Sequence, residues 1–126
     1  METNMVKTLK SNEEYMEYIK EKVSKVFPNW TIDDYINVPN VNGYFRVSFT
    51  FKELSIKFNK EFAELLINVS KRGQQIKYSI YKSLYNNIDN YIPVKSKSLP
   101  TAISVNLIDY YIDYLKENID KFEFEE

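Results

Sequence analysis

The feature that most constrains the fold is a strict alternation of apolar and polar residues in the middle of the chain. From Phe45 to Lys52, in FRVSFTFK, every second residue is apolar and the residues between them are polar. A period of two places the apolar side chains on one face of a β-strand, which is typical of an antiparallel sheet with one buried face. From Leu54 to Phe58 the alternation continues with the opposite parity. We therefore expect a tight turn near Lys52-Glu53 that joins two strands of one sheet.

The sequence on either side of this hairpin predicts further strands. Residues 64–70 fit a helix or a strand, and we favour the strand because Arg72-Gly73 follows as a turn. The residues from Ile76 to Tyr81 alternate again, which indicates a strand with its even-numbered residues on one face: Ile76, Tyr78 and Ile80. Upstream, the segment from Trp30 to Ile36 is expected to hold one short strand or a turn. The sum is an antiparallel meander of about four strands.

Two amphipathic helices are predicted outside the meander. Ser11 with Glu14 fits a capping box, a helical stripe follows through Tyr15, Ile19, Val23 and Val26, and Pro28 ends that helix. Near the C-terminus, apolar residues recur at helical spacing at Ile108, Tyr111, Ile112, Leu115, Ile119 and Phe122.

These elements predict an α+β fold: an N-terminal helix, an antiparallel β-meander, and a C-terminal amphipathic helix packed on the sheet. Residues 1–10 have no clear period and are expected to form a loose N-terminus, so the single domain spans residues 11–126. A chain of this length can build one core without disulfides or metals.

The composition excludes several kinds of chemistry. The chain has no cysteine and no histidine, which removes thiol nucleophiles, thiolate metal sites, the commonest general base and the usual zinc ligand. With only two glycines, no glycine-rich phosphate loop is possible. Asp109 and Asp113 are four residues apart on the C-terminal helix, but a solvated acidic face is the simpler interpretation. We expect no enzyme activity, no cofactor and no metal site.

The composition also indicates an origin. Phe, Tyr, Met, Ile, Asn and Lys, whose codons are AT-rich, make up 63 of the 126 residues. This bias favours a low-GC bacterium, or a phage or mobile element of one, although mutation bias alone produces the same pattern. No apolar run reaches the ~18 residues of a membrane helix, and the N-terminus lacks an apolar signal core. We therefore expect a cytoplasmic protein that does not bind a membrane.

The net charge of −1 hides two regions of opposite sign. Residues 57–98 carry eight Lys/Arg and three Asp/Glu, whereas residues 104–126 carry two Lys and seven Asp/Glu. In the basic region, the expected 71–82 hairpin offers cations beside an aromatic side chain, which is the chemistry of a phosphate-binding ribbon. Its candidate nucleic-acid-binding residues are Lys71, Arg72, Lys77, Tyr81 and Lys82. Only two arginines occur in the whole chain, however, and arginine is the usual phosphate-clamping residue.

The acidic region is better defined. At about 100° per residue, four acids fall on one flank of the C-terminal helix, and Tyr110 and Tyr114 fall on the side away from the core. Tyrosine gives a large contact area with a polar tip and is enriched at binding hot spots. The candidate partner-binding residues are Asp109, Tyr110, Asp113, Tyr114, Glu117 and Asp120. The alternative is that these tyrosines rest on the segment 83–100 or simply lie at the surface.

These observations lead to three functional hypotheses. The first is a small cytoplasmic protein that binds another protein, in its sharpest form an anti-CRISPR-like inhibitor whose acidic face blocks the basic groove of a host defence nuclease. An immunity protein that neutralises a toxin fits the same features. The third is a nucleic-acid-binding module that uses the 71–82 hairpin.

Overall fold

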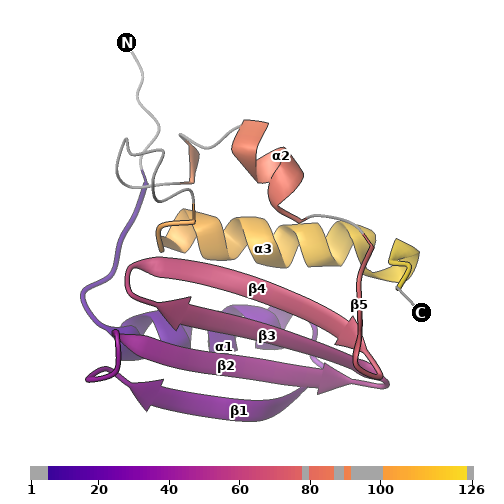
Figure 1. Ribbon diagram of the computed structural model, residues 1–126, viewed down its shortest axis with the longest axis horizontal. Coiled ribbons are helices and arrows are strands. Elements are labelled where there is room, and N and C mark those ends of the chain that lie inside the picture. Colours follow the sequence, from indigo (N-terminus) through magenta and orange to yellow (C-terminus); the bar gives the residue numbers. More distant parts are fainter. Residues whose placement is uncertain (1–5, 78–79, 87–89, 92–100, 125–126) are drawn as a thin grey trace.

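The computed structural model describes residues 6–77, 80–86, 90–91 and 101–124 of the chain. In order, its elements are α1 (Asn12–Val26), β1 (Thr31–Val38), β2 (Tyr44–Phe51), β3 (Leu54–Glu61), β4 (Glu64–Lys71), β5 (Gln74–Gln75), α2 (Tyr81–Asn86), α3 (Val105–Asn118) and a short 3-10 helix, η2 (Ile119–Lys121). The strands form one antiparallel sheet in the order β1-β2-β3-β4-β5. The predicted α+β class is therefore confirmed, as Figure 1 shows.

The alternation that dominates the sequence sets the two faces of the sheet. Antiparallel pairing places Phe49 opposite Ile56, and Ile56 opposite Val69, so one row of apolar side chains crosses three strands. The chain reverses at Lys52-Glu53, where Lys52 has a φ of 56°, so the predicted turn is confirmed. Residues 64–71 form β4, which confirms the strand over the helix. The buried row contains Phe45, Val47, Phe49, Ile56, Phe58, Leu65, Ile67 and Val69.

Helices α1 and α3 complete one core with this face of the sheet. Ser11 caps α1 as predicted, because its side chain accepts a hydrogen bond from the Glu14 amide. The buried residues of both helices join the sheet residues in a single cluster, and α1 also contacts α3. Figure 1 shows α1 behind the sheet and α3 beside β4. Among the described residues no helix covers the opposite face of the sheet, which is mainly polar.

Part of the expected loose N-terminus is bound to this core. The amide of Leu9 donates to the hydroxyl of Tyr15 at 2.8 Å, and the amide of Val105 donates to the carbonyl of Lys7 at 2.8 Å. Residues 1–5 lie outside the described residues.

The segment from Trp30 to Ile36, expected to hold one short strand or a turn, forms β1, so the strand is confirmed and is longer than expected, at eight residues. The prediction of a strand from Ile76 to Tyr81 was wrong over the described residues: β5 contains only Gln74 and Gln75, and Tyr81 begins α2. Ile76 makes an isolated bridge with Phe124, and Tyr78 lies outside the described residues.

The physical reason for the missing strand is that other groups pair with the outer edge of β4. The hydroxyl of Tyr81 lies 3.0 Å from both the amide nitrogen and the carbonyl oxygen of Ile67, so it accepts from one and donates to the other. The Leu65 amide donates to the carbonyl of Thr101 at 2.8 Å, and the Leu65 carbonyl accepts from the buried hydroxyl of Tyr111 at 2.7 Å. These bonds satisfy polar main-chain groups that a neighbouring strand would otherwise pair with.

We expect Tyr111→Phe to lower the free energy of unfolding by about 1–3 kcal/mol, because it leaves the buried Leu65 carbonyl without its donor. Tyr44→Phe is the matched control. The Tyr44 hydroxyl lies on the polar face of the sheet, 3.5 Å from Asn59 Oδ1, and its loss is expected to cost no more than about 0.5 kcal/mol. Urea denaturation of both variants measures the difference. Equal effects would show that the hydroxyl of Tyr111 does not hold α3 to β4.

Candidate functional site

A groove with a volume of about 430 Å³ runs along α3. Five of the six acidic-face residues predicted from the sequence line it, and three further polar or aromatic residues complete it. The lining residues are Tyr91, Asn106, Asp109, Tyr110, Asp113, Tyr114, Glu117 and Asn118. The residues from α3 are three or four positions apart, which places them on one face of the helix.

The cap of α3 fixes one wall of this groove. Ser104 is fully buried, accepts a hydrogen bond from the Leu107 amide at 2.9 Å, and donates its hydroxyl proton to the carbonyl of Tyr91. Asn106 donates to the carbonyl of Asn90 at 3.3 Å. Asn90 and Tyr91 are thereby held beside the first turns of α3, although they are distant from it in sequence.

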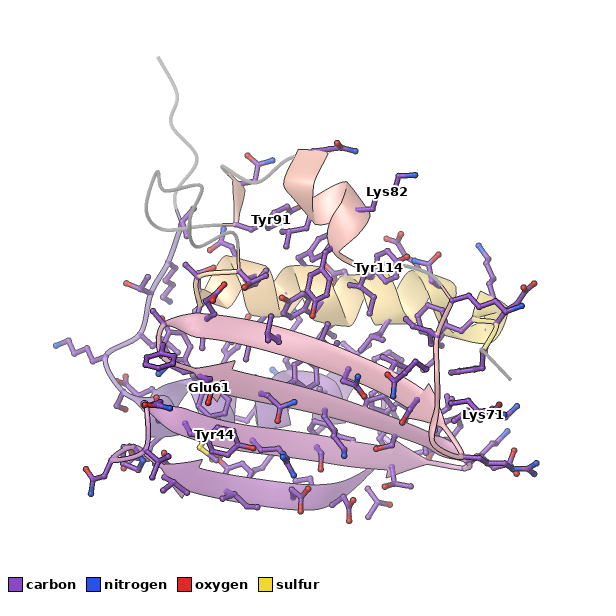
Figure 2. All side chains as sticks on the ribbon, in the orientation of Figure 1. Tyr44, Glu61, Lys71, Lys82, Tyr91 and Tyr114 are labelled. Carbon is purple, nitrogen blue, oxygen red and sulfur yellow. The ribbon has the colours of Figure 1, made fainter. Side chains whose placement is uncertain are left out.

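The two predicted tyrosines form the apolar side of the groove and are half-buried. Tyr110 donates its hydroxyl proton to the carbonyl of Ile80 at 2.6 Å, and its ring centroid lies 4.9 Å from that of Tyr91. Tyr114 stacks on Phe122, with 6.3 Å between the ring centroids. The two tyrosines therefore lie on a half-buried face of α3 rather than on an exposed one. Tyr110 instead fits the alternative, because it contacts a residue of the segment 83–100. Figure 2 shows Tyr91 and Tyr114 over α3, on the same side as α2.

The acidic residues of the groove differ in what they contact. Asp109 Oδ1 accepts hydrogen bonds from the Tyr18 hydroxyl at 2.5 Å and from Lys22 Nζ at 3.0 Å, so this carboxylate joins α3 to α1. Asp113 and Glu117 are exposed, and neither forms an ion pair with another described residue. They are the carboxylates of the groove that remain available to a ligand.

Asp120 lies apart from this groove. It belongs to η2 and lines a second groove of about 320 Å³, together with Lys116 and the aromatic pair of Phe27 and Trp30. The rings of that pair stack with centroids 3.9 Å apart. The structure therefore separates Asp120 from the other five predicted residues.

The negative charge of the groove acts on the nearby Tyr18. Burial raises the pKa of its phenol, and the hydrogen bond to Asp109 and the charges of Asp109 and Asp113 raise that pKa further. A phenolate at this position would lose its hydrogen bond and face two carboxylates. Burial and these two carboxylates therefore disfavour an anion at this position.

The residues of the predicted basic hairpin do not form one surface. Lys71 and Arg72 both pair with Glu53, and the hydroxyl of Tyr81 is bonded to β4. Lys77 and Lys82 are exposed. Figure 2 shows Lys71 at the end of the sheet and Lys82 on α2, away from it. The predicted ribbon of alternating cations and tyrosine is therefore absent from this part of the described chain.

Sequence reasoning missed three residues of the groove. Asn106 and Asn118 continue the same helical spacing as Tyr110 and Tyr114, so a helical projection of polar residues could have included them. Tyr91 could not have been found in this way, because only the tertiary hydrogen bond from Ser104 places it there.

The described residues contain no group of three or more carboxylates that could hold a metal ion. Among their helices, none has the length and apolar character needed to cross a bilayer. Comparisons with protein-family models, curated proteins and solved structures give no match to this chain. The groove must therefore be interpreted from its own chemistry.

Because the pKa of Tyr18 is higher in the folded state, its contribution to stability is complete below about pH 10, the ordinary tyrosine pKa, and is lost as the pH rises above it. We expect the free energy of unfolding to fall as the pH rises from about 10 to about 11.5. Tyr18→Phe should make this fall smaller, and urea denaturation at several pH values measures it. An unchanged pH dependence in the variant would contradict the proposed contact.

Proposed function

We propose that this protein is a non-enzymatic binding protein whose α3 groove receives a basic surface of another protein. The observation that carries the proposal is that one groove combines a tyrosine-lined wall with two carboxylates, Asp113 and Glu117, that form no ion pair among the described residues. Such a groove offers ion pairing to Lys or Arg and a flat aromatic surface for their aliphatic chains or guanidinium planes.

The charge of the region favours a cationic partner. Residues 104–126 carry seven acids and two lysines, and the groove lies within this region apart from Tyr91. Complementary charge raises the rate of encounter and selects against anionic partners. Nucleic acid is disfavoured at this face because its phosphates would approach the carboxylates.

A protein is favoured over a small cation by the composition of the groove. Tyrosine residues are enriched in the energetically dominant parts of protein interfaces, where they combine apolar area with a polar tip. The Tyr110 ring is fixed by Ile80 and Tyr91, so a partner would not have to immobilise it. Such preorganisation lowers the entropic cost of association.

The fuller form of the proposal is inhibition. Basic grooves that bind nucleic acid are a common source of exposed Lys and Arg clusters, and an acidic protein that occupies one prevents nucleic acid from entering. A host nuclease blocked by a phage-encoded protein, or a toxin blocked by its immunity protein, would each satisfy this chemistry. The AT-rich composition is consistent with a phage or mobile element of a low-GC bacterium.

Affinity capture from a low-GC bacterial lysate, followed by mass spectrometry, identifies partners of the wild-type protein. The captured protein is then purified, and its affinity is measured by calorimetry at several salt concentrations. We expect Asp113→Lys with Glu117→Lys to weaken binding at least roughly tenfold, since each reversal replaces an attraction with a repulsion. Wild-type binding should also weaken as salt rises.

The control for this experiment is Glu61→Lys, which changes the net charge by the same amount as a single reversal in the groove but lies at the end of β3. It should bind like the wild type, whereas Asp113→Lys alone should bind more weakly. Equal binding by Asp113→Lys and Glu61→Lys would place the partner elsewhere. If the partner's nucleic acid still binds when the complex is saturated, the inhibitory role is contradicted.

A further inference from the structure

The two long edges of the sheet differ in how far their main-chain groups are hydrogen-bonded. On β4, main-chain groups of two residues are bonded to side chains or loops: Leu65 to Thr101 and Tyr111, and Ile67 to Tyr81. Just before β4, the carbonyl of Ala63 accepts a hydrogen bond from the Ile103 amide. On β1, the opposite edge, the described residues supply no comparable cover, and β2 is its one neighbouring strand. Figure 1 shows β1 as the outermost strand, far from α3. An uncovered edge exposes main-chain donors and acceptors to any extended segment that approaches it.

The side chains of β1 add apolar surface on both sides of this edge. Ile32 and Tyr35 lie opposite Phe49 and Val47 and so share the helix-covered side of the sheet. On the other side lie Ile36 and Val38, and the four side chains are between 37% and 43% exposed. A strand added beside β1 would cover part of this apolar surface on both faces at once.

One of these side chains is already held in place. The Tyr35 hydroxyl donates to Glu17 Oε2 at 3.0 Å, and Lys20 Nζ lies 5.4 Å from the centre of its ring. Burial, this hydrogen bond and the nearby charges of Glu17 and Glu21 raise the pKa of Tyr35 to about 12. A fixed aromatic side chain beside an open edge is ready to pack against an incoming strand without losing rotamer freedom.

We propose that β1 binds an extended, basic segment of another protein by strand addition. The main chain supplies the hydrogen bonds, and the alternate side chains of the segment pack on the apolar residues of β1. The bulge at Asp33 interrupts the register, so the regular part of the edge runs from Asp34 to Val38. This length is within the usual range for a strand. The binding surface is separate from the α3 groove and does not depend on it.

The charge of the residues around β1 determines which kind of segment can bind at this edge. Asp33 and Glu21 are exposed and form no ion pair among the described residues, whereas Asp34 pairs with Arg46, and Glu17 with Lys20. The edge is therefore acidic overall. A second copy of the chain would bring the same unpaired acids to one seam, since a two-fold interface joins identical surfaces. Lysine or arginine side chains on an incoming strand would pair with them instead.

The test uses an acetylated, amidated peptide of about nine residues in which Lys and Val alternate, a length that covers one strand. Backbone amide spectra of the labelled full-length chain report where it binds. We expect shifts and slower hydrogen exchange at residues 31–38, and little effect from the matching peptide of Glu and Val. The double variant Asp33→Lys with Glu21→Lys should bind the Lys peptide at residues 31–38 roughly tenfold more weakly, while Glu61→Lys, at the end of β3, should bind it there like the wild type.

Four results would overturn the proposal. They are equal binding of the Lys and Glu peptides, shifts confined to the α3 groove, absence of binding at residues 31–38, and a dimer that forms without peptide and protects those residues. The last result would assign the edge to a second copy of the chain. Shifts in the α3 groove that Asp113→Lys abolishes, with residues 31–38 unaffected, would instead support the α3 groove as the site for basic segments, so the two proposals can fail separately.

Discussion

The positions of α2 and α3 depend on two tyrosine hydroxyls that form hydrogen bonds with the outer edge of β4. Tyr81 and Tyr111 bond to the main chain of β4, at Ile67 and Leu65. These bonds take the place of another strand and fix α2 and α3 against the sheet. Because buried main-chain groups must be paired, the cost of losing either hydroxyl exceeds the value of one exposed hydrogen bond. The position of α3, and hence of its groove, follows from this edge.

The same arrangement leaves two surfaces of similar chemistry at opposite sides of the molecule. The groove on α3 presents Asp113 and Glu117 beside tyrosine rings. At the other side, strand β1, whose outer edge no described segment covers, presents apolar side chains with Asp33 nearby. We propose that both surfaces bind basic protein segments, the first through side chains and the second through the main chain. A single partner that reached both would gain from each, since a second contact on the same molecule is effectively intramolecular.

The sequence predicted those parts of the fold that local periodicity determines. Phe45 to Phe58 defined two strands and their turn, and the stripe through Ile108 and Leu115 defined α3. The same reasoning failed at Ile76–Tyr81, where alternation indicated a strand. That failure has a tertiary cause. The hydroxyl of Tyr81 forms a hydrogen bond with the main chain of β4 that a neighbouring strand would otherwise form, and no local sequence pattern reveals this contact. Helical spacing likewise brought five acidic-face residues to one groove, but it could not predict Tyr91 or the half-buried state of Tyr110.

Site-specific photocrosslinking tests directly whether the α3 groove is the surface that binds a basic partner. A photoreactive phenylalanine analogue is placed at Tyr114, which lines the groove, or at Tyr44, which lies on the polar face of the sheet. Each protein is irradiated with its captured partner, and the crosslinked peptides are sequenced. We expect Tyr114 to crosslink to a Lys- or Arg-rich surface of the partner, and we expect no crosslink from Tyr44. Crosslinking from Tyr44 alone, or from Tyr114 to an acidic surface, would contradict it.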